Sequence, residues 1–217
     1  MDARDGWAAI SSAQELRDLM GPPMPRAAAK DRTRLLELDR TFLAASPFCL
    51  IATSDADGNC DVSPKGDPPG FTLVLDDATI AIPDRPGNRR ADGLRNILAN
   101  PHVGLIHLVP GRADTLRING RARLLRDAPF FDRMVVDGHR PSVAILVEVE
   151  QVFLHCPKAF MRSALWDPER WDPGALPSTA RMVTMVQEVT ESLAELEAYY
   201  GPSYARRLYG SAGRDEA

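Results

Sequence analysis

The sequence predicts a mainly β domain, a small closed antiparallel barrel, with helices on either side of it in the chain. Between residues 48 and 156, six or seven short apolar segments follow one another, and only one substantial helical pattern interrupts them. Most connections are short, and the one at 55–59 carries an Asp-Gly hairpin signal. Because hairpins join antiparallel strands, these connections favour a barrel over a doubly wound sheet.

The composition narrows the class of protein. The 217 residues carry 26 Lys and Arg against 30 Asp and Glu, and this mildly acidic balance argues against a general nucleic-acid binder. No apolar run is long enough to span a membrane, and the start of the chain lacks the pattern of a signal peptide. The three cysteines have no metal-type spacing, so we expect reduced thiols in a cytoplasmic protein without a metal site.

The individual elements follow from periodicity and from turn residues. A Ser at 11 or 12 caps the first helix, and Pro47 ends the second. The expected elements are, in chain order, helices at 11–20 and 31–45, strands at 48–55, 60–64, 71–77 and 79–84, a helix from Asn88 to about Asn100, strands at 102–110, 115–127 and 144–156 with a short helix at 128–135, and a final helix at about 178–200.

The final helix has apolar residues at heptad spacing. Steps of 4, 3, 4, 3 and 4 residues separate Met182, Val186, Val189, Leu193, Leu196 and Tyr200. This stripe would pack either on the protein's own barrel or against a partner subunit.

The stretch IPDRPGNRRADGLRNILANP at 82–101 contains an unusual group of cations. With Asn88 as N-cap, Arg89 and Arg90 fall in the first helical turn, where the helix dipole favours Asp or Glu. A bound phosphate would satisfy both the free backbone N–H groups and the two charges. Alternatively, both arginines are solvated or pair with Asp84 and Asp92.

Three further positions are candidates for binding a ligand or for reactivity. Lys65 follows a strand directly, in VSPKGDPPGF at 62–71, where two prolines and two glycines fix the backbone beside a ligand or merely form a rigid turn. Thr115 shares the polar face of its strand with Arg117 and Asn119, and this face lines a cleft or faces water. Cys156 lies near cations that would activate a thiol, but burial as a structural residue is the stronger expectation.

Taken together, these motifs resemble a known family. SPKGDPPGF, IPDRPGNRR, HVGLIHLVPG and TLRINGRARL occur in the order seen in the pyridoxamine 5'-phosphate oxidase-like flavoproteins, over about residues 30–165. With HCPKAF they look like a bacterial subfamily of FMN-dependent enzymes without an assigned substrate. The C-terminal substrate-binding pattern of the oxidase itself is not intact here, so the resemblance does not extend to pyridoxamine phosphate oxidation.

The resemblance implies a homodimer of six-stranded split β-barrels with FMN between the subunits. It divides the chain into an N-terminal helical extension at 1–46, a split barrel at 47–165 and a C-terminal extension at 166–217. By position, Asn88, Arg89 and Arg90 match the segment that binds the FMN phosphate, and Lys65 matches a lysine near the cofactor. The other implied cofactor-binding residues are Val62, Ser63 and Pro64 along the ring edge, Ile82, Pro83 and Asp84 beside the ring and ribityl chain, Thr115 reaching the flavin of the second subunit, and, more loosely, Arg162 and Trp166.

The function expected from this resemblance is FMN-dependent oxidoreduction of a small-molecule substrate by hydride transfer at the flavin. No side chain is an evident acid or base, so the catalytic residues stay open. Two alternatives also stay open, namely a deazaflavin-dependent reductase on the same fold and a non-enzymatic carrier or sensor that binds flavin or haem.

Overall fold

The computed structural model describes residues 6–209 and divides into two compact units, Met1–Asp31 and Arg32–Ala217. The first unit contains helices α1 (Ala13–Met20) and α2 (Pro25–Ala28). As the sequence predicted, Ser12 caps α1, and its side chain accepts a hydrogen bond from the Glu15 backbone N–H at 3.1 Å. The three-part division at residues 46 and 165 stays a prediction.

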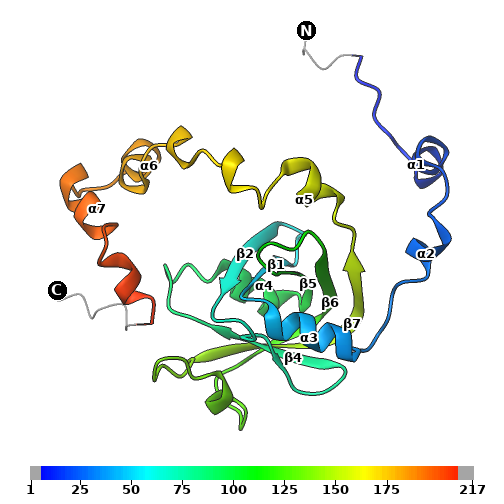
Figure 1. Cartoon of the computed structure of the whole chain (residues 1–217), viewed down its shortest axis with the longest axis horizontal. Coiled ribbons are helices and arrows are strands. Elements are labelled where there is room, and N and C mark those ends of the chain that lie inside the picture. The colour runs from blue at the N-terminus through cyan, green and yellow to red at the C-terminus, as the bar shows by residue number, and fades with distance from the viewer. Residues whose placement is uncertain (1–5, 210–217) are drawn as a thin grey trace. The chain divides into compact units, whose positions relative to one another are not determined.

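The second unit is built on one antiparallel sheet whose strand order is β2-β1-β5-β6-β7-β4-β3 (Figure 1). The strands are β1 (Phe48–Ser54), β2 (Cys60–Gly66), β3 (Leu73–Val74), β4 (Thr79–Asp84), β5 (His102–Leu108), β6 (Thr115–Leu125) and β7 (Val143–His155). This is a seven-stranded sheet of split-barrel type, one strand more than the six that the family resemblance implied, and each of the seven strand segments expected from the residue pattern forms a strand. The third, β3, has only two residues, whereas the sequence predicted a strand at 71–77.

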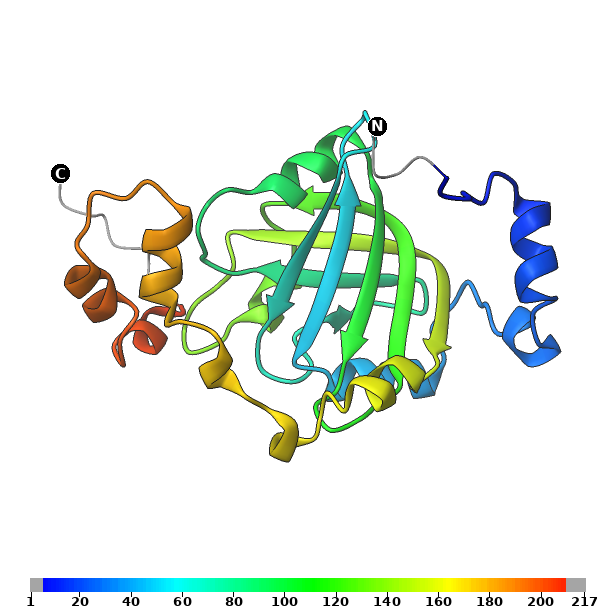
Figure 2. The same ribbon diagram turned by 90° about the horizontal axis from the view of Figure 1, so that it is seen from above.

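The helices of this unit are α3 (Glu37–Ala45), α4 (Asp92–Ala99), α5 (Lys158–Ser163), α6 (Thr179–Val186) and α7 (Leu193–Tyr199), with 3₁₀ turns η1 (Phe131–Met134), η2 (Pro168–Arg170), η3 (Pro173–Ala175) and η4 (Tyr204–Arg207). Helices α3 and α4 contact the sheet (Figure 2), and α6 and α7 contact each other. Among the described residues, no helix has both the length and the apolar character needed to cross a membrane.

The core lies inside the curved sheet, and a smaller cluster lies under the β6–β7 connection. The larger cluster buries alternate residues of β1, β5, β6 and β7, together with Phe42 and Leu43 of α3 and Ile97 of α4. In the smaller cluster, Phe131 and Met134 of η1 pack on Leu146 of β7. The second cluster fixes the loop that follows η1, and this loop reaches the candidate site.

The first and the last of the helices predicted within this unit differ from their predicted bounds. Residues 31–36 are not helical, and Arg32 pairs instead with Val152 through two backbone hydrogen bonds of 2.7 and 3.1 Å. The helix predicted at 178–200 is interrupted between α6 and α7. Ser192 starts α7 with a capping box to Glu195, which breaks the continuous heptad stripe into two short faces.

Gly120 marks a close approach between strands β6 and β7. The register shifts between Asn119 and Gly120, so the long strand β7 carries a bulge at this point. A Cβ atom built on Gly120 would lie 2.0 Å from the backbone oxygen of Glu148. Only glycine therefore fits here without moving a strand.

We predict that Gly120→Ala lowers the free energy of unfolding by about 2 kcal/mol or more, because strand β7 must shift away from the new methyl group. Chemical denaturation monitored by circular dichroism measures this loss. Gly87→Ala is the matched control, since a Cβ atom on Gly87 meets nothing within 4 Å. Equal stability of the two variants would contradict the close approach.

His107 generates a pH-dependent prediction. Its ring is fully buried on β5, Thr72 Oγ1 lies 3.1 Å from Nε2, and Nδ1 has no hydrogen-bond partner. Burial lowers the pKa of His107 from 6.5 to about 3. The unfolded chain thus takes up this proton below pH 6.5, whereas the folded protein takes it up only below about pH 3.

The contribution of His107 to stability is therefore complete above pH 6.5 and falls as the pH is lowered from 6.5 to 3, by several kcal/mol at most. Urea denaturation at a series of pH values measures this slope. His107→Gln removes the titrating group, so its slope over the same window should be shallower than that of the wild type. Identical slopes would show that His107 is not a buried neutral imidazole.

Candidate functional site

A pocket of about 1040 Å³ opens at one end of the barrel. Its walls come from β1, β2, the end of β4, the loop 85–91, α4, the loop 139–142, the start of β7 and Tyr209. The volume lies at the upper end of the range typical of cofactor and small-molecule sites. Segments far apart in the sequence therefore meet around one cavity.

Strand β2 contributes one polar face to the pocket. Alternation along the strand leaves Asp61, Ser63 and Lys65 half-buried, and all three line the pocket. Val62 is on the opposite, exposed face. Because β2 is the edge strand of the sheet, Pro64 is accommodated without breaking the ladder.

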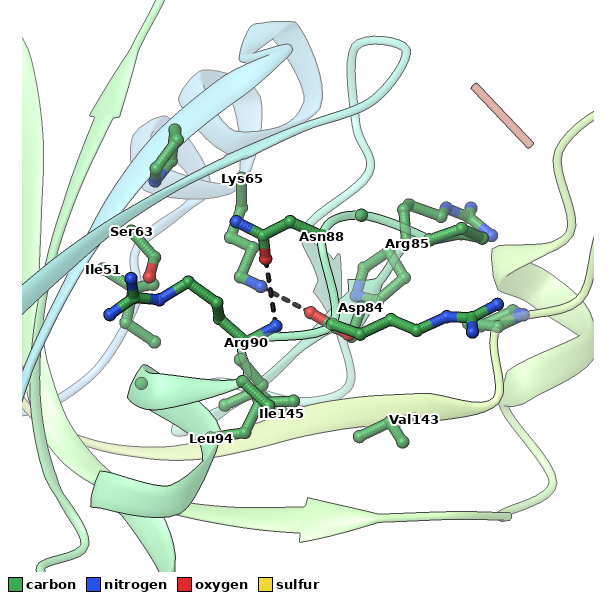
Figure 3. Close-up of a pocket in the computed structure, with 18 of the residues that line it drawn as sticks. Ile51, Ser63, Lys65, Asp84, Arg85, Asn88, Arg90, Leu94, Val143 and Ile145 are labelled. Carbon is green, nitrogen blue, oxygen red and sulfur yellow. Dashed lines mark hydrogen bonds and ion pairs between the residues drawn. The ribbon is translucent and has the colours of Figure 1, made fainter. Parts of the chain in front are cut away.

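Lys65 and Asp84 form an ion pair between β2 and the end of β4. The side chains are 19% and 24% exposed, so the pair is largely shielded from solvent. Figure 3 shows this pair beside the hydrogen bond between Asn88 and Arg90, with Leu94, Val143 and Ile145 below them. Charged groups and an apolar floor thus lie in the same cavity.

The loop before α4 differs from the predicted helix start. Asn88 does not cap the helix; its Oδ1 accepts a hydrogen bond from the Arg90 N–H at 3.1 Å. Arg89 and Ala91 both adopt positive φ, 59° and 58°, and α4 begins only at Asp92. The arginines therefore precede the helix, and its first turn holds the acidic residue that the helix dipole favours.

Helix α4 is seated against the polar face of β1 and β2. A Cβ atom on Gly93 would lie 3.3–3.4 Å from side-chain oxygens of Asp61, Ser63 and Thr53. The Asn96 side chain donates to Thr53 Oγ1 at 3.1 Å. These contacts fix the position of the loop 85–91 above the sheet.

Arg85 lines the pocket and connects three segments of the chain. Its Nε donates to Asp67 Oδ2 at 2.6 Å, and the two side chains are only 12% and 1% exposed. Its Nη groups donate to the backbone oxygens of Met134 and His139 at 2.7 and 3.1 Å. One guanidinium thus connects the end of β4, the β2–β3 loop and the loop after η1.

Eight of the residues predicted from the sequence line this pocket. They are Ser63, Pro64, Lys65, Pro83, Asp84, Asn88, Arg89 and Arg90. The structure does not bring the other five into it: Val62 faces outward, Ile82 and Thr115 are buried in the barrel, Arg162 is exposed on α5, and Trp166 donates its indole N–H to the Arg112 carbonyl at 2.7 Å. Whether any of the thirteen binds a cofactor stays a prediction.

No sequence pattern predicted the wall opposite β2. His139, Arg140 and Ser142 line it with Tyr209. The placement of the loop that holds His139 and Arg140 depends on the small cluster around Phe131. Tyr209 reaches the pocket through long-range contacts for which no local pattern exists.

The cysteines do not line this pocket. Burial raises the pKa of Cys49 to about 12, so its thiol stays protonated. Cys156 is exposed rather than buried, because it lies just beyond the last residue of β7. Within residues 6–209, no group of three or more His, Cys, Asp and Glu residues is arranged to hold a metal ion.

The fold and the pocket define a split-barrel protein with a cation-rich pocket at one end of the barrel. Residues 35–156 match the family model of pyridoxamine 5'-phosphate oxidase, which is more than half of the chain. The chain therefore belongs to the pyridoxamine 5'-phosphate oxidase-like family of FMN-binding split barrels, as the motifs predicted.

Several solved structures match part of this chain at low sequence identity. HupZ of Group A Streptococcus is 17% identical, with a TM-score of 0.45 over 55% of this chain and 93% of that one. A Clostridium acetobutylicum protein related to general stress protein 26 is 13% identical, with a TM-score of 0.41 over 53% and 83%. The heme storage protein HutZ of Vibrio cholerae is 17% identical, with a TM-score of 0.40 over 56% and 94%. Since these TM-scores lie below 0.5, the likenesses support no functional assignment. The curated proteins contain no match.

We predict that Arg85→Ala lowers the free energy of unfolding by about 3 kcal/mol, because it leaves the Asp67 carboxylate buried without its cation. Arg34→Ala is the matched control. Arg34 also pairs with an aspartate, Asp77, but these side chains are 66% and 49% exposed, so the loss should stay below about 1 kcal/mol. Thermal and urea denaturation measure both variants. Similar losses would show that the Arg85–Asp67 pair is not a buried constraint.

Proposed function

We propose that the protein is an FMN-dependent oxidoreductase that acts on a small molecule, with the cofactor in the pocket at the end of the barrel. The observation that carries this proposal is the assembly of eight residues that the family resemblance implied, from β2, the end of β4 and the loop 85–91, around one cavity. Membership in a family of FMN-binding split barrels also supports it.

The donors at the loop 85–91 fit a phosphate group. Arg90 carries five N–H donors, and the contact with Asp92 engages Nε at 2.7 Å. The Arg90 side chain is 75% exposed, so a phosphate at the mouth of the pocket would meet an accessible cation. Arg89 and Ala91, both at positive φ, turn the backbone around Arg90. Backbone turns of this kind form anion-binding concavities in proteins.

The deeper part of the pocket fits a flat, largely apolar ring. Ile51, Leu94, Ile97, Val143 and Ile145 line it beside the Lys65–Asp84 pair. An amphipathic cofactor needs this combination of apolar walls and a few fixed polar groups. When bound, FMN would supply a ring that accepts and returns a hydride.

The protein's own residues would bind, orient and shield the cofactor. Arg89 and Arg90 would hold the phosphate, and the backbone from Ser63 to Lys65 would run beside the ring. Lys65, kept in place by Asp84, holds a positive charge in a shielded part of the pocket, where it would stabilise negative charge on a neighbouring group. A homodimer in which a second copy completes the site remains part of this proposal.

We predict that the purified protein binds FMN and that the double variant Arg89→Ala/Arg90→Ala binds it at least about 50-fold more weakly, because two charge-assisted contacts to phosphate are lost. Quenching of flavin fluorescence measures both affinities. Arg34→Ala/Arg112→Ala is the control, since it removes two exposed, aspartate-paired arginines away from the pocket.

A comparison of the affinities for FMN and for riboflavin, which lacks the phosphate, isolates the contribution of the phosphate contacts. The wild type should prefer FMN strongly over riboflavin, and the double variant should lose most of that preference. An unchanged preference would place the phosphate elsewhere. If the wild type takes up a deazaflavin or haem but not FMN, the cofactor in the proposal is wrong, and uptake of none of the three would refute the proposal.

A further inference from the structure

The chain returns to the pocket long after leaving it. Beyond β7 it runs through α5, α6 and α7 and turns back toward the loop that precedes α4 (Figure 1). There the Tyr209 hydroxyl donates a hydrogen bond to Asp67 Oδ1, a residue 142 positions earlier, and Tyr209 lines the pocket. The cofactor proposal makes no use of this contact.

Tyr209 is held by groups that are themselves fixed. The same Asp67 carboxylate accepts from Arg85 through its other oxygen, at 2.6 Å. The Arg85 guanidinium lies 5.6 Å from the centre of the Tyr209 ring, and the His139 ring stacks on Tyr209 at 5.9 Å with an interplanar angle of 19°. Arg85 also donates to the His139 carbonyl, so these residues form one connected cluster.

The residues of this cluster are held with different strength. Asp67 and Arg85 are almost completely buried, and their ion pair is anchored to two backbone oxygens. Tyr209 belongs to residues 204–209, called here the C-terminal segment, and the turn η4 in this segment is exposed. A hydrogen bond to a charged group contributes about 1.5–3 kcal/mol, which is enough to favour the docked position while leaving it reversible.

The contact between Tyr209 and Asp67 lies at one wall of the pocket. His139, Arg85 and Tyr209 all line the pocket, on the side opposite the polar face of β2. The Tyr209 ring contacts His139 and Arg85, so the docked ring holds this wall together. Without Tyr209, Asp67 would keep one of its two side-chain hydrogen-bond donors, and the His139 ring would lose its stacking partner.

We propose that Tyr209 is a positioning residue that retains the pocket's ligand, and that docking of the C-terminal segment on Asp67 governs ligand release. The choice of FMN as ligand rests on the function proposed above. The hydroxyl supplies the hydrogen bond, and the ring supplies the stacking on His139.

The test compares Tyr209→Phe, which removes only the hydroxyl, with Tyr209→Ala, which removes the ring as well. After dilution of the FMN complex, we expect the Phe variant to release FMN about tenfold faster than the wild type and the Ala variant to release it faster still. Tyr204→Phe is the control, because the same change in the same segment leaves the ring contacts of Tyr204 with Arg207 and Tyr199 intact. Its release rate should equal that of the wild type.

A second measurement needs no ligand. Arg206 and Arg207 precede Tyr209 closely, so trypsin cleavage there reports whether the segment is docked. Cleavage should be several-fold faster in Tyr209→Phe than in the wild type or in Tyr204→Phe, with the barrel's melting temperature unchanged within about 2 °C.

The two proposals fail in different ways. A wild type that does not bind FMN refutes the proposed cofactor. A wild type that binds FMN and releases it at the same rate as both Tyr209 variants refutes the retention role of Tyr209. Equal trypsin cleavage in Tyr209→Phe and the wild type refutes the docking itself, with or without a ligand.

Discussion

The buried ion pair between Arg85 and Asp67 is the constraint on which the candidate site depends. Asp67 is 1% exposed and lies in the β2–β3 loop, so its charge must be neutralised by a group that reaches it from elsewhere. Arg85 does so from the end of β4, and it also donates to the backbone oxygens of Met134 and His139. The β2–β3 loop and the loop after η1 are thereby held in place beside the same cavity.

A buried ion pair of this kind contributes more to specificity than to net stability. The desolvation of both charges offsets much of their attraction, and an apolar pair of equal volume would often stabilise a fold as well. An apolar pair, however, would not select one orientation of the loops. The three hydrogen bonds that Arg85 donates, two of them to carbonyl oxygens, favour the arrangement in which His139 faces the pocket. This accounts for an arginine directly after the strand β4, whose central residues are apolar.

The sequence predicted the strands well and the ends of the helices less well, for physical reasons. Alternation of apolar residues depends on one buried face, so β1, β5, β6 and β7 were evident without knowledge of their neighbours. Helix starts depend on which residue takes the cap. Asn88 has the ideal side chain for an N-cap, yet it bonds Arg90 within a local turn, and α4 starts at Asp92. In the same way, Ser192 starts a new helix inside a segment whose apolar residues are spaced as in one continuous helix.

The pocket was predictable on one side only. Ser63, Lys65, Asp84 and Arg90 belong to motifs that can be recognised within a few residues of sequence, and the hairpin order brings them together. The opposite wall depends on a hydrophobic cluster around Phe131, on one buried ion pair and on a tyrosine near the end of the chain. None of these has a local signature, since each is defined by a partner far away in the sequence.

This difference between the walls also suggests how the site would work. The side formed by β2 and α4 is fixed by strand pairing and by the packing of Gly93 on the polar face of the sheet, so it is suited to holding a cofactor in one orientation. On the opposite side, Arg85 holds the loop of His139, but Tyr209 at the outer edge is held by one side-chain hydrogen bond and by ring contacts, so releasing Tyr209 costs far less than opening the barrel. A ligand that enters or leaves would therefore do so past Tyr209, while the groups around Lys65 and Arg90 stay in place.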